Sequence, residues 1–400
     1  MNTTPSSERI NIGFFGAVNS GKSSLMNAVT SQNVSIVSNI KGTTTDPVRK
    51  TMEILPIGSV ELYDTAGFDD NSPGSDLRIK KTLEILRKTD LALLVTGKAS
   101  SLNESETEMV RKFTEHNIPY IIVHSKSDLT DENIIYTANE ISVSAKTRDG
   151  IEELKRLMCS VYLSSLNENK PRYKSVADGL AERESVVILV MPIDDSAPKG
   201  RLILPQVQTL RSLLDSFAIT VTVQPSELCS VLKLLKRLPD LVITDSQVFS
   251  FVKDIVPENV PLTSFSILMA RYKGILPETL NGIESLKNLK DGDCVLISEG
   301  CTHHRQCGDI ARDKLPVWIE SFTSRKLCFE FTSGGTFPAD IKKYSLIVHC
   351  GGCMLSSREL EYRQLSAKTL GIPFTNYGIL IAAVNGILDR SVKHIKKHKI

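Results

Sequence analysis

The feature of this sequence that most constrains its fold is a glycine-rich loop near the start of the chain. The loop reads Gly16-Ala17-Val18-Asn19-Ser20-Gly21-Lys22-Ser23 and fits the pattern G-x-x-x-x-G-K-[ST]. It follows an apolar segment, Ile10–Phe15, and precedes a helix expected to begin near Lys22. In this context backbone N–H groups of residues 19–23 cradle phosphates, Lys22 reaches the terminal ones, and Ser23 binds Mg²⁺. Ser24 is also expected to contribute to nucleotide binding. The loop therefore predicts a nucleotide-binding domain built on a mostly parallel sheet.

The pattern of apolar segments predicts an α/β protein of three domains. In the first, residues 1–168, strands are expected at 10–15, 60–63, 91–95, 120–123 and 141–143, with helices between them. A polar stretch at 167–174 indicates a linker to a second α/β domain, residues 175–268. Its expected strands are 186–193, 219–223 and 241–244, and its helices 206–217, 227–238 and 247–255. The third domain, residues 269–400, has expected strands at 294–298, 327–331, 346–349 and 372–375, and helices at 314–322, 356–370 and 379–396.

Four further segments of the first domain carry residues that GTP binding and hydrolysis need. Thr44 can close a mobile loop over Mg²⁺ and the γ-phosphate, while Asp64-Thr65-Ala66-Gly67 supplies a carboxylate near the metal and the Gly67 amide for that phosphate. In Ser125-Lys126-Ser127-Asp128, Asp128 can accept hydrogen bonds from the N1–H and exocyclic amine of guanine, which adenine does not offer. Lys126 is assigned to the same base site. Ser144-Ala145-Lys146 resembles the loop whose amide contacts the guanine carbonyl, so the set favours GTP over ATP.

These motifs resemble the translation-factor class of GTPases, most closely the group that contains the tRNA-modification GTPase TrmE and the ribosome-assembly GTPase Era. The resemblance implies that Asn19 helps to hold a K⁺ ion in place of an arginine finger, so K⁺ should stimulate turnover. Phe68 stands where Ras-like enzymes have a water-orienting Gln, which predicts slow intrinsic hydrolysis. Ser125 stands where the group usually has Asn. We expect this change to remove a hydrogen bond to the base and a tether to the phosphate loop, weakening guanine affinity but not the specificity through Asp128.

A second group of reactive side chains lies in the last hundred residues. Three cysteines and two histidines occur as Cys301-Thr302-His303 and His349-Cys350-Gly351-Gly352-Cys353. Both clusters follow expected strands, and the carboxyl ends of parallel strands are where an α/β sheet binds its ligands. A zinc site would take a fourth ligand from His303, His349 or Cys307, whereas an iron–sulfur cluster on Cys301, Cys350 and Cys353 would leave one iron open. The side-chain chemistry alone does not separate zinc from a cluster, and the two histidines are either ligands or supporting hydrogen-bond donors.

The composition narrows the classes of partner. The 48 basic and 46 acidic residues nearly cancel and only 6% of residues are aromatic, so no surface for nucleic acid or for an anionic membrane is expected. No apolar run reaches membrane-spanning length and no secretory signal is visible, so we expect a cytoplasmic protein whose eight cysteines stay reduced. Four of these lie in apolar stretches and are expected to be small core residues, namely Cys159, Cys229, Cys294 and Cys328.

The GTPase motifs, combined with Cys301-x-His303 and His349-Cys350-x-x-Cys353, resemble the HydF family of GTPases that mature iron-iron hydrogenases. The resemblance covers essentially the whole chain. It implies a scaffold that carries a 4Fe-4S cluster on Cys301, Cys350 and Cys353 together with a transient di-iron precursor, which it delivers to the apo FeFe-hydrogenase. It also implies two radical-SAM maturases as upstream partners and a homodimer formed through the middle domain. The alternative is a TrmE- or Era-like GTPase of tRNA modification or ribosome assembly that carries a structural zinc site.

Overall fold

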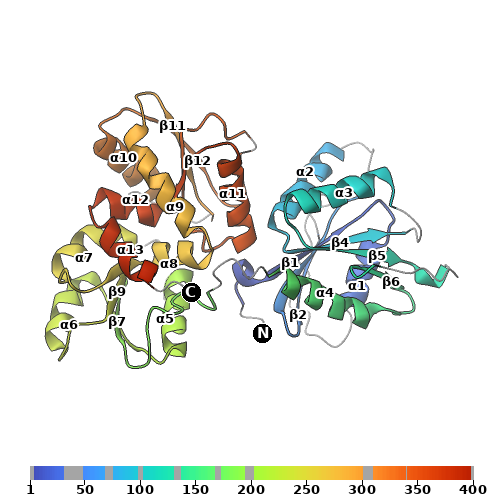
Figure 1. Cartoon of the computed structure of the whole chain (residues 1–400), viewed down its shortest axis with the longest axis horizontal. Helices are drawn as coiled ribbons and strands as arrows, with labels where there is room; N and C mark the ends of the chain where they lie inside the picture. Colours follow the sequence, from blue (N-terminus) through green and yellow to red (C-terminus); the bar gives the residue numbers. More distant parts are fainter. Residues whose placement is uncertain are drawn as a thin grey trace. The chain divides into compact units, whose positions relative to one another are not determined.

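The chain folds into two compact units, Met1–Asn169 and Lys170–Ile400 (Figure 1). The computed structural model describes residues 4–30, 48–67, 75–97, 102–129, 137–166, 173–193, 202–300, 310–338 and 340–397. Three of the expected site residues, Thr44, Cys301 and His303, lie outside these ranges, as do Phe68 and Cys307. In the described residues no helix is both long and apolar enough to cross a membrane.

The first unit is built on a six-stranded sheet of order β2-β3-β1-β4-β5-β6. β2 runs antiparallel to β3, and the other neighbouring pairs are parallel. The sequence predicted the five parallel strands and not β2, because this edge strand contains three charged residues, starts with two exposed ones and lacks a continuous apolar run. The strands are β1 (Ile10–Phe15), β2 (Val48–Ile54), β3 (Gly58–Asp64), β4 (Leu91–Thr96), β5 (Tyr120–Ser125) and β6 (Glu140–Val143).

Helices cover both faces of this sheet. Leu25 of α1 (Lys22–Thr30) and Leu154 of α4 (Ile151–Ser165) belong to one hydrophobic core with the strands. Leu86 of α2 (Ser75–Lys88) and Phe113 of α3 (Glu104–Glu115) belong to a second core, formed with the residues that alternate along the same strands. Because helices bury both faces of the sheet, ligands can reach it at the ends of its strands.

The second unit contains two four-stranded, all-parallel sheets. The first has the order β10-β9-β7-β8 and the second the order β12-β11-β13-β14. One continuous hydrophobic core joins the two sheets and their helices. Its strands are β7 (Val186–Val190), β8 (Ile219–Val223), β9 (Leu241–Thr244), β10 (Leu262–Ser264), β11 (Cys294–Ser298), β12 (Cys328–Thr332), β13 (Leu346–His349) and β14 (Phe374–Asn376). Its helices are α5 (Leu204–Asp215), α6 (Leu228–Leu234), α7 (Phe249–Ile255), α8 (Phe265–Tyr272), α9 (Leu276–Ile283), α10 (Leu315–Thr323), α11 (Ser357–Thr369), α12 (Tyr377–Val384) and α13 (Leu388–Lys397).

The expected single helix over 379–396 is wrong, because the structure has two helices there, α12 and α13. Gly386 adopts a left-handed conformation, with φ of 69°, directly after α12. Its N–H donates to the carbonyl of Ala383, and the N–H of Ile387 donates to that of Ala382. These two bonds make a Schellman motif, which satisfies the last carbonyls of α12 and ends the helix. The chain can then change direction before α13.

Candidate functional site

The expected GTP-site residues that the structure describes lie together at the carboxyl ends of the strands of the first sheet. The phosphate loop follows β1, Asp64 ends β3, Ser125 ends β5, and Ser144 follows β6. Side-chain hydrogen bonds join these segments. Lys126 Nζ donates to the carbonyl of Asn19 at 3.1 Å. Four segments far apart in sequence thus form one pocket rim, as the parallel topology requires.

Two glycines are required by the close packing of this rim. A Cβ atom on Gly16 would lie 2.2 Å from the carbonyl oxygen of Val95. One on Gly67 would lie 2.5 Å from the Val18 side chain and 2.7 Å from its backbone nitrogen. Neither separation is possible for a real side chain. The phosphate loop therefore packs directly against the end of β4 and against the segment that follows Asp64.

Lys22 and Ser23 begin α1 with their side chains already arranged for a phosphate and a metal. Lys22 is buried, and its Nζ donates to the carbonyls of Gly16 at 2.9 Å and Ala17 at 2.6 Å, on the inside of the loop. These carbonyls hold the ammonium group where nucleotide phosphates would contact it. The Ser23 hydroxyl donates to Oδ2 of Asp64.

Asp64 has the environment of a ligand for a hard cation. Burial raises the pKa of its carboxyl, while the hydrogen bond from Ser23 and the charges of Lys22 and Lys50 oppose that rise. Its second oxygen, Oδ1, is buried and has no hydrogen-bond partner among the described residues. Carboxylate and hydroxyl oxygens are what Mg²⁺ binds in proteins, so Ser23 and Asp64 fit a Mg²⁺ ion that also contacts nucleotide phosphates.

The base side of the pocket is organised by the hydroxyl of Ser144. This buried hydroxyl donates to Oδ1 of Asp128 at 2.7 Å and accepts from the backbone N–H of Thr147 at 3.1 Å. The bond lowers the pKa of Asp128, and the charge of Lys146 adds to the effect. Asp128 is therefore an oriented, ionised acceptor. Sequence reasoning assigned the 144–146 loop to backbone contacts and missed this side-chain role of Ser144.

The expected loss of the tether at Ser125 is wrong. The Ser125 hydroxyl donates to the carbonyl of Ser20 in the phosphate loop at 2.6 Å. Because β5 ends beside the loop, with a Cβ on Gly21 only 3.3 Å from the hydroxyl, a short side chain is long enough to make this bond. The base side and the phosphate side thus remain linked.

The second expected site lies at the carboxyl ends of β11 and β13. Ser298 and His349 are paired at the ends of these strands, and the N–H of Cys350 donates to the carbonyl of Ser298 at 2.9 Å. The Cys350 sulfur accepts from the N–H groups of Gly300 at 3.0 Å and Gly352 at 3.4 Å. Such bonds stabilise a thiolate. Burial and the nearby Cys353 nevertheless raise the pKa of the Cys350 thiol to about 11, so a bound metal would have to displace its proton.

His349 is held in one tautomer by residues on both sides. The N–H at Nδ1 donates to the carbonyl of Cys350 at 2.8 Å, and Nε2 accepts from Arg363 at 3.1 Å. Burial and the charge of Arg363 lower the pKa of His349 to about 3, so the ring is neutral. In this arrangement both ring nitrogens are occupied by protein partners, and the ring orients the backbone of Cys350. Arg363 itself is buried and also binds the Gly334 carbonyl and Glu359.

Lys273 brings a positive charge to Cys353 that sequence reasoning missed. Its Nζ donates to the carbonyl of Leu355 at 2.9 Å, and the side chain is buried. Burial raises the pKa of Cys353, and the charge of Lys273 opposes that rise. Lys273 directly follows α8, and the surrounding sequence, Arg271-Tyr272-Lys273-Gly274, carries no metal-site pattern. The available signal was a pair of basic residues, Arg271 and Lys273, at the end of an apolar segment.

The described part of this site does not contain a full ligand set. Over the described ranges, no three or more His, Cys, Asp or Glu side chains gather as a metal site. The expected third thiolate, Cys301, and its neighbour His303 belong to the range 301–309, outside the description. Two soft sulfur donors with backbone N–H bonds and a nearby cation are a donor set that fits an iron–sulfur cluster or zinc.

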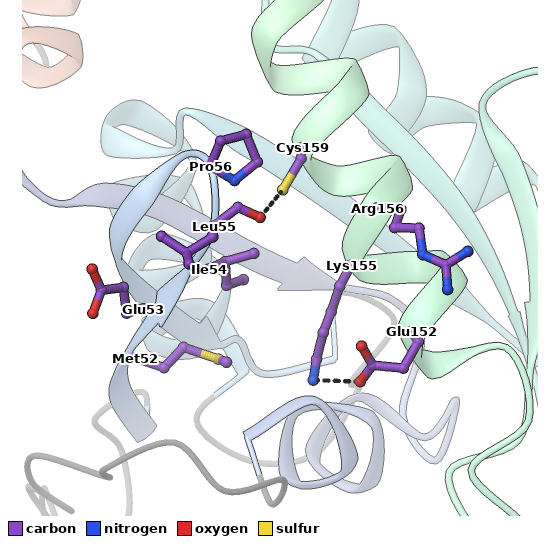
Figure 2. Close-up of a pocket in the computed structure, with 9 residues that line it drawn as sticks. All are labelled: Met52, Glu53, Ile54, Leu55, Pro56, Glu152, Lys155, Arg156 and Cys159. Carbon is purple, nitrogen blue, oxygen red and sulfur yellow. Dashed lines mark hydrogen bonds and ion pairs between the residues drawn. The ribbon is translucent and has the colours of Figure 1, made fainter.

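A separate hollow of about 480 Å³ lies at the far end of the hairpin formed by β2 and β3 (Figure 2). The end of β2 and the turn that follows it form one wall, and α4 forms the other. Figure 2 shows the Cys159 thiol pointing to the carbonyl of Leu55, which accepts its hydrogen bond at 3.6 Å, and Lys155 paired with Glu152 at 2.9 Å. None of the expected nucleotide-site residues lines it. The register pairs Ile54 with Gly58 at this end and Val48 with Asp64 at the other, so the hollow and the nucleotide pocket are at opposite ends of the hairpin.

Three models of known protein families match successive ranges of the chain, one in the first unit and two in the second. Residues 11–126 match the model of the 50S ribosome-binding GTPase family. Residues 176–274 match the hydrogen maturase F dimerization domain, and residues 277–394 match the hydrogen maturase F tetramerization domain. These two hydrogen maturase F models together cover more than half of the chain.

Among curated proteins, the tRNA modification GTPase MnmE of Thiobacillus denitrificans is 34% identical over 149 residues, covering 37% of this chain and 33% of the relative. MnmE of Neisseria gonorrhoeae is 37% identical over 158 residues, 38% of this chain and 35% of the relative. The chain thus spans about a third of the length of these relatives. Among solved structures, the G domain of the T. maritima FeoB iron transporter is 22% identical, with a TM-score of 0.29, and covers 39% of this chain and 99% of that one.

Proposed function

Because this chain belongs to the hydrogen maturase F family and has its GTPase, dimerization and tetramerization domains in order, we propose that it is a maturation scaffold for FeFe-hydrogenase. In this role a GTPase domain, residues 1–168, controls a carrier formed by a dimerisation domain, 175–268, and a cluster domain, 269–400. The cargo is a di-iron precursor delivered to the apo-hydrogenase. Two radical-SAM maturases act upstream, and neither nucleic acid nor a membrane takes part. The protein works in the cytoplasm.

The nucleotide pocket supports the GTPase part of this function. Lys22 and the phosphate loop would bind the phosphates, with Asn19, Ser20, Gly21 and Ser24 in the same cradle. Ser23, Asp64 and Thr44 would bind Mg²⁺, and the Gly67 amide would face the γ-phosphate. Asp128, with Lys126 and the loop of Ser144, Ala145 and Lys146, would select guanine. Residues of this chain thus supply both the charge and the base recognition that GTP hydrolysis requires.

The observation that carries the proposal is the pair of neighbouring thiols, Cys350 and Cys353, in a chain with hydrogen maturase F domains. Cys350 and Cys353 would hold a 4Fe-4S cluster together with Cys301, and three cysteine ligands would leave one iron for an exchangeable group. When bound, the cluster supplies an iron that can accept a ligand from the cargo. Gly300 and Gly352 orient the Cys350 sulfur, Lys273 would balance the charge of Cys353 once its thiol is deprotonated, and His349 fixes the Cys350 backbone. His303 is proposed to support the site in the same way.

Metal content tests this proposal against the main alternative. The full chain, purified without oxygen, should be brown and contain about four irons per chain. A colourless protein with one zinc per chain would instead support a TrmE- or Era-like GTPase with a structural zinc site. Iron content, zinc content and the visible spectrum are measured on the same sample.

Single substitutions separate the two sites. Cys350→Ser or Cys353→Ser should abolish cluster binding and hydrogenase activation and leave GTP turnover near the wild-type rate, because these thiols lie in the second unit. Lys22→Ala should impair GTP binding and leave the iron content unchanged. Cys229→Ser, which removes a cysteine elsewhere in the second unit, serves as the control for the two cysteine variants. Iron retained in both cysteine variants and in Cys301→Ser would contradict the ligand assignment.

Potassium is proposed as a cofactor of the hydrolysis step. Asn19 adopts a left-handed backbone conformation, with φ of 61°, in the phosphate loop, and its carbonyl accepts from Lys126. We expect GTP turnover to fall several-fold when K⁺ is replaced by Na⁺ at constant ionic strength. Asn19→Ala should turn over GTP at one low rate in both salts. Equal wild-type rates in K⁺ and Na⁺ would rule out the potassium site.

A further inference from the structure

Two cysteines with no part in the proposed function lie side by side in the second sheet of the second unit. Cys294 opens β11 and Cys328 opens β12, and the parallel register pairs these two residues directly. Their Sγ atoms are 3.2 Å apart, and both are free thiols. The expectation that they are core residues is wrong for Cys328, which is exposed, while Cys294 is half-buried. Cys229 is also exposed, and of the four only Cys159 is buried.

We propose that Cys294 and Cys328 are a redox site that forms a reversible intramolecular disulfide by reaction with disulfides of low-molecular-weight thiols. The sulfurs already touch, so closing the bond needs only a small side-chain rotation rather than movement of the strands. Hydrogen bonds of the ladder keep the two backbones at fixed register. The site needs neither GTP nor a cluster, and it is independent of the proposed function.

The two thiols differ in a way that sets the order of reaction. Exposed Cys328 is the one that an external disulfide, RSSR, can reach, so its thiolate attacks and releases RS⁻ to leave a mixed disulfide. Burial, the hydrogen bond that Cys294 donates to the Cys328 sulfur and the Glu330 carboxylate raise the pKa of Cys294 to about 11, and Lys343 opposes this rise. Cys294 therefore reacts second. Its sulfur attacks Cys328, its proton leaves with the second RS⁻ as RSH, and the sum is two protein thiols oxidised and one RSSR reduced to two RSH.

The position of the pair gives this bond a structural consequence. β12 is the edge strand of its sheet, and β11 is the strand that leads towards Gly300, whose N–H binds the Cys350 sulfur. The disulfide would join the edge strand to its neighbour and close a loop from Cys294 to Cys328 that includes Cys301. Because a cross-link stabilises a protein mainly by constraining its unfolded chain, oxidation should raise the melting temperature of the second unit.

Peptide mapping of the full chain tests the proposal. Protein purified without oxygen is equilibrated with mixtures of reduced and oxidised glutathione, remaining thiols are alkylated, and the chain is digested with trypsin and with a protease that cuts after Glu. Cleavage after Glu299 separates Cys294 from Cys301, and cleavage after Lys343 separates Cys328 from Cys350. We expect the peptides of Cys294 and Cys328 to be recovered joined, with the loss of two hydrogen atoms, and to separate after reduction.

Variants of the pair supply the controls. In Cys294→Ser the reaction should stop at the mixed disulfide of Cys328 with glutathione, and in Cys328→Ser the cross-link and the mixed disulfide should both be absent. Cys229→Ser, which removes an exposed cysteine elsewhere in the unit, should behave as wild type. Wild-type peptides that remain separately alkylated at the most oxidising ratio, or that carry glutathione on Cys328 without a cross-link, would overturn the proposal.

Discussion

Ser125 shows how a single hydroxyl can replace the side chain that a GTPase of this group usually has. Its bond to the Ser20 carbonyl links β5 to the phosphate loop, so removing it should loosen the loop that binds the phosphates. A hydrogen bond of this kind contributes about 0.5–1.5 kcal/mol net. We expect Ser125→Ala to weaken GTP binding by about 2- to 10-fold, from the same free energy.

Calorimetry of GTP binding measures this effect, with two comparison variants. Ser125→Asn introduces the longer side chain typical of the group and should bind GTP at least as well as the wild type. Ser165→Ala removes an exposed hydroxyl that bonds within α4 and should change nothing. Wild-type affinity in Ser125→Ala would mean that the tether contributes no binding energy.

The buried carboxylate of Asp64 is predicted to lower the stability of the nucleotide-free protein, although Mg²⁺ binding requires it. Burial raises its pKa in the folded protein, so the stability associated with its proton is present at low pH and is lost as the pH rises through that raised pKa. Asp64→Asn removes this cost and should raise the melting temperature of the nucleotide-free protein near neutral pH. The rise should be about 2–4 °C if the cost is about 1 kcal/mol.

The pH dependence distinguishes this cause from a general change in packing. The difference in melting temperature between Asp64→Asn and wild type should shrink as the pH falls below the raised pKa, because Asp64 is then protonated and neutral. The same variant should lose Mg²⁺-dependent GTP turnover, since an amide is a weaker ligand for Mg²⁺ than a carboxylate. A difference that stayed constant with pH would contradict an electrostatic origin.

At the scale of secondary structure, the sequence predicted buried strands well and boundaries set by special residues poorly. Mainly apolar runs located β1, β9, β11 and β13 at their observed bounds, and the alternating pattern of β-branched residues located β8. β2 was missed because its half-exposed, charged pattern does not differ from that of a loop. The break between α12 and α13 depends on one left-handed glycine within a strongly apolar stretch, where the helical periodicity continues on both sides.

The candidate sites divide in the same way. The phosphate loop, Asp64 and Asp128 could be predicted because each is part of a contiguous motif beside a strand. Arg363 and Lys273 could not be predicted, because only tertiary packing brings them to the site of Cys350 and Cys353. Arg363 belongs to α11, and Lys273 directly follows α8. Ser125 was misjudged because the consequence of a shorter side chain depends on how near the strand end lies to the loop.

At the scale of the whole molecule, the exposed edge of the sheet formed by β7–β10 is the surface through which we expect this chain to associate. β8 is an edge strand that begins at Ile219, which is 52% exposed. Phe217, in the connection before it, is 67% exposed, and Leu214 of α5, whose carbonyl accepts from the Phe217 N–H, is 54% exposed. An unpaired strand with large apolar side chains is a template for pairing with another chain. Because residues 176–274 match a dimerization domain, the partner we propose is a second copy of this chain.

Ile219→Lys tests this arrangement because it places a charge where two copies of β8 would meet. A buried, unpaired charge opposes association, so the wild-type particle should split into particles of half its mass, measured by light scattering after size-exclusion chromatography. Leu163→Lys, a matched change at an exposed leucine of α4, should keep the wild-type mass. GTP turnover per chain should be unchanged in both variants, since Ile219 and the nucleotide pocket belong to different units. If Ile219→Lys kept the wild-type mass, the copies would have to associate through a surface other than β8, and the proposed pairing of β8 would be wrong.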